Sequence, residues 1–162
     1  MPDSGFVSEN GKGAGEGANV NVPLPPGSGT GAYLAAFERV VAPALRRFKP
    51  ELLIVASGLD ASVYDPLARQ MMTSDGYRDL TKIMMDVASD VGGKLVVSHE
   101  GGYSPVYVAF CGLAVVETLA GVRTIPDPYI DMAAGMGAQE LQPHQDAAIK
   151  ESEALVDRVP AA

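Results

Sequence analysis

The stretch Leu52-Leu53-Ile54-Val55-Ala56-Ser57-Gly58-Leu59-Asp60-Ala61 decides the expected fold. A short, continuous apolar run that ends at a glycine is typical of a strand buried on both faces, as in a parallel sheet. The run Leu95-Val96-Val97-Ser98 repeats this pattern and leads into the loop His99-Glu100-Gly101-Gly102-Tyr103. Open α/β sheets bind ligands beyond the carboxyl ends of their strands. If the two strands are neighbours, Asp60 and Tyr103 are expected to face one crevice.

Helical patterns surround the two expected strands. Apolar residues at helical spacing predict a helix over residues 30–48, which Pro43 should kink or divide. Thr73 is expected to cap a second helix, and the apolar stretch 106–120 predicts a third. This order of elements indicates an α/β fold with a parallel sheet and right-handed crossovers. Only two strong strands are present, so the sheet is expected to be part of a larger one.

The two ends of the chain are less regular. Gly13-Ala14-Gly15-Glu16-Gly17-Ala18 matches a loose dinucleotide-binding fingerprint, but no strand precedes it and prolines follow it, which favours a structural loop. Alternation over residues 19–22 predicts a short strand. Residues 1–125 are expected to form the main α/β unit, and residues 126–162 a linker and a C-terminal helix. That polar helix, from about residue 137 to 159, is expected to pack loosely on the outside.

Composition excludes several classes of protein. The 162 residues suffice for one domain with a core, and 47% of them are apolar. A net charge of −8 leaves no basic patch for nucleic acid and mildly favours cationic substrates. The sequence contains no run of about 18 apolar residues, so no membrane span is predicted, and no signal peptide is visible. Cys111 is the only cysteine, and its apolar surroundings favour a buried core thiol, which fits a cytoplasmic protein.

Taken alone, the residues after the strands allow two interpretations. Asp60 could cap the turn that follows it, which is the commoner role, or act as a metal ligand or base. Tyr103 could be an ordinary packed tyrosine, or the preceding glycines could admit a substrate to which its phenol donates a hydrogen bond. His99 and Glu100 have no further partners at ligand spacing, so they form no metal motif.

Several motifs in order resemble one family. The segment Ser57 to Leu67 resembles the S-G-F-D-A…D-P-L of zinc-dependent histone deacetylases, and Glu100-Gly101-Gly102-Tyr103 resembles their E-G-G-Y. The glycine-rich opening through residues 19–27 is similar to their N-x-N-x-P-L-P-P-G stretch, and residues 73–77 to their T-x-x-G-Y. The matches run in order from Gly5 to Gly121. The closest resemblance is to bacterial class II-like deacetylases and acetylpolyamine amidohydrolases.

The resemblance implies the arginase/deacetylase α/β fold and a zinc cofactor. It implies that Asp60 is one of three zinc ligands and that the phenol of Tyr103 donates a hydrogen bond to the oxyanion. It further implies that Leu67 lines an acyl-lysine channel and that Gly101 and Gly102 border its floor. Zinc suits this chemistry because it takes carboxylate and imidazole ligands and keeps one position open.

The departures from the family pattern decide what is expected of this chain. Leu59 replaces a phenylalanine, which is a tolerable apolar change. The family's other two zinc ligands and its adjacent histidine pair have no counterpart, because the only histidines are His99 and His144. The chain therefore resembles the C-terminal portion of a deacetylase. By itself it is expected to show no deacetylase activity and no tight zinc site, since one carboxylate cannot supply three ligands.

Three functional hypotheses follow. The first is a zinc-dependent amidohydrolase that removes acyl groups from acyl-lysine or acylpolyamine, with a site that is incomplete in this chain. The second is a non-catalytic remnant that binds a partner or an acylated ligand. The third is a nucleotide-binding α/β domain. An incomplete parallel sheet is also expected to self-associate or to pair with a missing N-terminal portion, because it leaves an unpaired edge and an uncovered apolar face.

Overall fold

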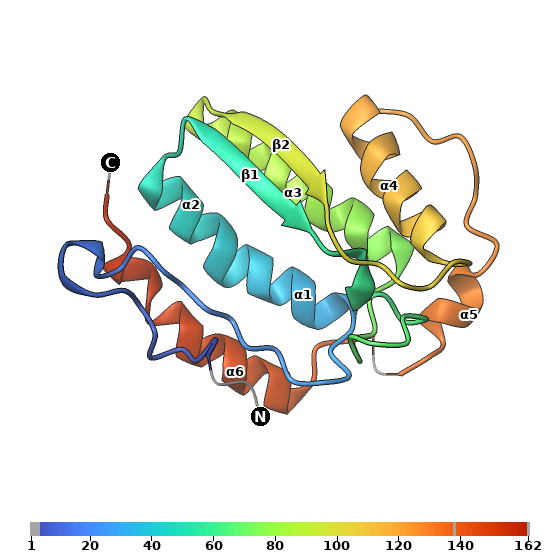
Figure 1. Ribbon diagram of the computed structural model, residues 1–162, viewed down its shortest axis with the longest axis horizontal. Helices are drawn as coiled ribbons and strands as arrows, with labels where there is room; N and C mark the ends of the chain where they lie inside the picture. The colour runs from blue at the N-terminus through green and yellow to red at the C-terminus, as the bar shows by residue number, and fades with distance from the viewer. Residues whose placement is uncertain (1–3, 138, 162) are drawn as a thin grey trace.

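The computed structural model describes residues 4–137 and 139–161, and it is an α/β fold with a parallel sheet flanked by helices (Figure 1). Within these residues, no helix is both long and apolar enough to cross a membrane. The elements, in chain order, are η1 (Gly13–Gly15), α1 (Thr30–Ala36), the π-helical η2 (Phe37–Val41), α2 (Ala42–Phe48), β1 (Leu52–Ser57), η3 (Leu59–Ala61), α3 (Ser74–Val91), β2 (Lys94–His99), α4 (Val108–Ala120), α5 (Ile130–Ala134), α6 (Pro143–Glu153) and η4 (Val156–Arg158).

Strands β1 and β2 pair in parallel, and α3 forms the crossover between them. One face of this sheet packs on α2 and α3, where Leu53 meets Met84 and Val87 in a buried cluster. The other face leaves Ile54 64% exposed and Val96 48% exposed. The prediction of a parallel sheet is confirmed. The prediction that both faces of its strands are buried is wrong for the described residues, whose burial alternates along each strand.

The first long helix changes type in its middle. Helical backbone runs from Thr30 to Phe48, but the segment Phe37–Val41 is π-helical. Pro43 is the second residue of α2, in its first turn, where a residue without an N–H is tolerated. Pro43 therefore interrupts the regular α-helix as expected, through a local widening of the helix.

The start of α1 depends on a residue from the other end of the chain. The cap position is Gly29, and the N–H of Thr30 donates to the side-chain oxygen of Gln139 at 3.1 Å. The N–H of Gly31 donates to the backbone oxygen of Gln139 at 2.7 Å. Gln139 thus satisfies two of the helix N–H groups that have no partner within the helix.

The predicted strand at residues 19–22 is wrong. This segment pairs with no strand in the part of the chain that the structure describes, and its asparagines bind loop backbone instead. Asn19 donates to the carbonyl of Glu9, and Asn21 donates to the carbonyl of Phe6 at 2.9 Å. Hydrogen bonds from short polar side chains to backbone compete with strand pairing. The alternation of polar and apolar residues over 19–22 therefore belongs to a loop that asparagine side chains hold in place.

The C-terminal region also differs from the expectation. Two elements, α6 and η4, stand where one helix was expected, and α5 lies in the expected linker. Helix α6 lies against η2 and α1 (Figure 1). Ile149 is fully buried in a cluster with Val40, and Arg39 binds Asp146 at 2.7 Å and Glu153 at 2.5 Å. The loose external packing that polarity suggested is therefore wrong. The division at residues 125 and 126 stays a prediction.

A buried carboxylate joins α3 and α4. Glu117 is 2% exposed and accepts hydrogen bonds from the N–H and hydroxyl of Thr124, both at 2.6 Å, and from Ile125. Its other oxygen binds the guanidinium of Arg78 at 2.8 Å. The Thr124 hydroxyl first, and then the Thr124 N–H and Arg78, lower the pKa of Glu117 to about 2. This carboxylate fixes the turn that follows α4 against α3.

Candidate functional site

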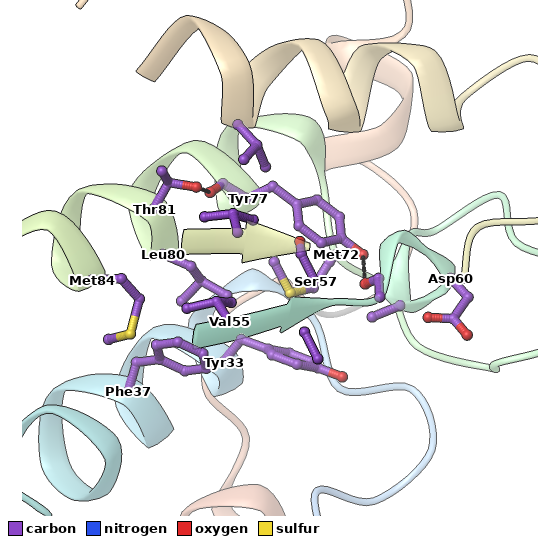
Figure 2. Close-up of a pocket in the computed structure, with 15 residues that line it drawn as sticks. Tyr33, Phe37, Val55, Ser57, Asp60, Met72, Tyr77, Leu80, Thr81 and Met84 are labelled. Atoms are coloured by element: carbon purple, nitrogen blue, oxygen red, sulfur yellow. Dashed lines mark hydrogen bonds between the residues drawn. The ribbon is translucent and has the colours of Figure 1, made fainter. Parts of the chain in front are cut away.

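The loop after β1 places Asp60 at the carboxyl end of the sheet. Asp60 lies in the short turn η3 and is half-buried, while its neighbour Leu59 is buried in the core. The hydroxyl of Tyr77, from α3, donates to the carbonyl of Gly58 at 3.1 Å (Figure 2). The turn is thus held from both sides, by an apolar anchor and by a hydrogen bond from a helix.

The loop after β2 lies beside this turn because the parallel pairing continues past the strands. The ladder ends at Ser57 opposite His99, and the N–H of Glu100 then donates to Ser57 at 3.0 Å. The N–H of Leu59 donates to Gly101 at 2.7 Å. These two bonds bring the motif after β2 against the motif after β1, as the sequence predicts for neighbouring strands.

Gly101 touches the carboxylate of Asp60. A Cβ atom added at Gly101 would lie 2.5 Å from Oδ2 of Asp60 and 2.8 Å from its Cγ. Any larger residue would therefore displace this carboxylate from its observed position. The Gly101 backbone therefore packs directly against the Asp60 side chain.

Glycine is required at position 102 both by its backbone conformation and by the close packing around its Cα. Its φ is +142°, and a Cβ added there would lie 2.6 Å from Cγ2 of Val108 and 3.0 Å from Cβ of Leu59. Gly102 therefore packs onto the first residue of α4 and onto the apolar anchor of the Asp60 turn. Its role as the floor of a substrate channel stays a prediction.

Tyr103 and Leu67 lie at exposed positions near this site. The Tyr103 side chain is 54% exposed, and its backbone N–H donates to Oδ2 of Asp65 at 2.8 Å. Leu67 is 64% exposed, and its N–H donates to Oδ1 of the same carboxylate at 2.8 Å. The structure thus connects the segments that carry these two candidate residues through Asp65.

An apolar cavity of about 310 Å³ lies between the sheet and the helices next to Asp60 (Figure 2). Its walls come from α1, η2, β1 and α3, and include Phe37, Val55, Leu80 and Met84. Burial, and then the negative charge of Asp60, raise the pKa of Tyr33 to about 12. The Tyr33 phenol therefore keeps its proton at neutral pH and can serve only as a neutral group in this cavity.

The metal-binding residues expected of a zinc site are not gathered among residues 4–137 and 139–161. These residues hold no group of three His, Cys, Asp or Glu side chains that could bind a metal. His99 ends β2 and His144 lies in α6, and both are exposed. The Asp60 carboxylate, held between Gly58 and Gly101, fits the role of a single ligand. The described residues therefore gather no complete set of zinc ligands.

Asp65 makes a contact that the sequence did not reveal. Asp-Pro suggests the start of a turn, and this accounts for its bonds to the N–H groups of Leu67 and Ala68. Its bond to Tyr103 crosses to a loop that follows another strand. That contact follows from the register in which β1 pairs with β2, and the sequence does not specify this register to within one residue.

Comparison with known proteins identifies the class to which this fold and loop arrangement belong. A family model, the histone deacetylase domain, matches residues 1–119. The chain belongs to the histone deacetylase family.

Individual relatives agree with this assignment. A histone deacetylase-like amidohydrolase of Pseudomonas aeruginosa is 54% identical over 107 residues, covering 65% of this chain and 28% of the relative. Histone deacetylase 8 of Arabidopsis thaliana is 42% identical over 130 residues, covering 80% of this chain and 34% of the relative. The chain thus spans about a third or less of the length of these relatives.

Solved structures resemble the chain over nearly its whole length. The crystal structure of the HDA15 HD domain superposes with a TM-score of 0.79 at 30% identity, covering 96% of this chain and 40% of that one. The histone deacetylase Clr3 gives the same score and identity and is covered to 24%. The observed elements therefore form part of a larger histone deacetylase fold, as the two-stranded sheet suggested.

Proposed function

We propose that this chain contributes one part of the active site of a zinc-dependent deacetylase acting on acylated lysine or acylated polyamine. The observation that carries the proposal is the extended ladder, which sets the Asp60 carboxylate against the Gly101 backbone within a chain of the histone deacetylase family. Asp60 would hold the metal together with ligands from polypeptide outside the described residues. A bound zinc ion supplies Lewis acidity toward water and the amide carbonyl in such sites.

The chain's own residues have separate tasks in this proposal. Tyr103 would donate a hydrogen bond to the substrate carbonyl oxygen as that oxygen gains negative charge, which favours the transition state over the ground state. Leu67 would contact the aliphatic part of the acylated side chain, and the glycines would let the substrate approach closely. The net charge of −8 favours the approach of cationic polyamines or lysine-rich segments.

The alternative is a non-catalytic member of the family that binds an acylated ligand or a protein partner. One observation favours it for the chain taken alone: the part of the chain that the structure describes gathers no three-ligand metal group. An experiment that supplies the remaining metal ligands therefore distinguishes the catalytic proposal from the non-catalytic alternative.

The test is a chimaera in which this chain replaces the matching 107 residues of the Pseudomonas aeruginosa relative. We expect the isolated chain, with added zinc, to deacetylate neither an acetyl-lysine peptide nor an acetylpolyamine. We expect the chimaera to deacetylate at least one of them in a manner that a chelator abolishes. A folded but inactive chimaera would favour the binding role. Chelator-sensitive turnover by the isolated chain, with one zinc per chain, would contradict the proposed division of the site.

A further inference from the structure

We propose that Asp65 is a positioning residue, which fixes Tyr103 relative to Leu67 and so sets the geometry of substrate entry at this site. The inference rests on the proposed function, because it assigns a consequence to the placement of these two residues. Its basis is one carboxylate that serves two loops. Oδ1 accepts from the N–H groups of Leu67 and Ala68 at 2.8 and 3.2 Å, and Oδ2 accepts from the N–H of Tyr103 at 2.8 Å.

The first loop holds Asp65 in a defined place. Its base is closed by the N–H of Val63 donating to Met72, and by the N–H of Met72 donating to Ala61, both at 2.9 Å. The N–H of Asp65 itself donates to Ser62 at 3.0 Å. The carboxylate therefore projects from a fixed turn, and its bond to the second loop transmits that fixed position.

The second loop needs such a contact because Tyr103 is not held by burial of its own side chain. That side chain is 54% exposed, whereas Gly102 before it is packed on Val108 and Ser104 after it is buried. Between these two anchors, the backbone N–H of Tyr103 donates to Asp65. Hydrogen bonds to a charged acceptor are stronger than those to a neutral one, so loss of this bond should loosen Tyr103 in particular.

The first experiment measures amide hydrogen exchange in the full chain by NMR. Asp65→Ser can still accept from Leu67, as serine does in similar turns, but is too short to reach Tyr103. Asp65→Asn removes the charge and one acceptor oxygen. We expect both variants to speed exchange of the Tyr103 amide by about tenfold or more. The Leu59 amide, which donates to Gly101, should stay protected, and Asp79→Asn on α3 is the matched control.

The second experiment measures steady-state kinetics in the chimaera described above. We expect Asp65→Ser to lower kcat by about tenfold or more, in line with the loosened Tyr103. In a Tyr103→Phe background, the same substitution should lower kcat by less than about twofold, because Asp65 acts through the phenol. A residue that merely stabilises the fold would lower kcat by the same factor in both backgrounds.

The outcomes separate this inference from the proposed function. If exchange of the Tyr103 amide is unchanged in both Asp65 variants, or if the kcat effects are independent, Asp65 is an ordinary turn residue and the inference is overturned. If Tyr103→Phe alone keeps full kcat, the role proposed for the phenol is wrong. The exchange experiment then still decides whether Asp65 holds the loop.

Discussion

Asp60 and Tyr103 contact different parts of the proposed reaction, so their substitution should have different effects. In the chimaera, Asp60→Ala should lower zinc content and activity together, because the carboxylate would touch the metal. Tyr103→Phe should leave zinc content and KM nearly unchanged while kcat falls by about 100- to 1,000-fold, the range for losing one oxyanion donor. Zinc per chain, measured beside kinetics, checks both. Full zinc content in Asp60→Ala would show that Asp60 does not hold the metal.

Gly101 should be intolerant of a methyl group for functional more than for structural reasons. The added Cβ would meet Oδ2 of Asp60 at 2.5 Å, and this side chain can rotate away. We expect Gly101→Ala to lower the free energy of unfolding by about 1 kcal/mol or less. Zinc affinity in the chimaera should fall by about 10- to 100-fold, as when a ligand loses its supporting contacts.

The control for this substitution is Gly15→Ala. A Cβ at Gly15 meets nothing within 4 Å, so stability and zinc affinity should both stay unchanged. An equal loss of zinc affinity in the two variants would show that the contact between Gly101 and Asp60 is irrelevant.

Single residues mark the limit of what the sequence could predict. Asp60, Gly101 and Gly102 stand in recognisable motifs after apolar runs, and the structure brings these motifs together. Asp65 could be read only as a turn residue, because its second oxygen binds a loop whose position depends on strand register.

The Glu117 carboxylate, which binds Arg78 between α4 and α3, should make the stability of the chain depend on pH. The pKa of Glu117 is lowered from 4.5 to about 2 in the folded chain, so the unfolded chain binds the proton more readily. The stability from this group is therefore complete above about pH 4.5 and is lost as pH falls toward 2. Urea unfolding midpoints of the wild type and Glu117→Gln, measured between pH 7 and 2, check this.

Glu117→Gln should be less stable than the wild type at pH 7 and should lose less stability on acidification. Glu38→Gln, at an exposed position on η2, is the matched control and should reproduce the wild-type profile. If the Glu117→Gln and wild-type midpoints differ by a constant amount at every pH, the change reflects packing and the assigned titration is wrong.

Elements whose apolar residues recur at helical spacing could be predicted from the sequence. Elements held in place by ion pairs between distant side chains could not. Thr73 caps α3 as expected, with its hydroxyl accepting from the N–H of Gly76 at 3.1 Å. The polar sequence of α6 concealed its tight packing, because Arg39 neutralises Asp146 and Glu153 at the contact. Such a pairing depends on residues more than 100 positions apart, which local pattern does not reveal.

At the scale of the whole molecule, the exposed face of the sheet predicts association of the isolated chain. Leu52, Ile54 and Val96 are each about half or more exposed on adjacent parallel strands. Light scattering coupled to size exclusion should show dimers or larger species, and Ile54→Lys should shift them toward monomer. Leu67→Lys is the matched control, because Leu67 is equally exposed at 64% but lies off the sheet.

A wild-type chain that is monomeric and melts cooperatively at high temperature would contradict this prediction. The sequence indicated an incomplete sheet from its two strong strands alone. It also predicted that this incomplete sheet would leave an apolar face uncovered. It did not specify which residues would form that face, because a continuous apolar run does not show which of its side chains point to which side.

The bonds between the two ends of the chain also bear on how fast it folds. Gln139 meets Thr30 across 109 positions, and Ser152 donates to Asn21 across 131. Contacts of such high sequence separation form only after a large loop closes, and they slow folding relative to helical proteins with local contacts. Until those ends meet, the first turn of α1 lacks its bonds to Gln139. Refolding should therefore pass through a period in which the sheet and α3 have formed while α1 still frays.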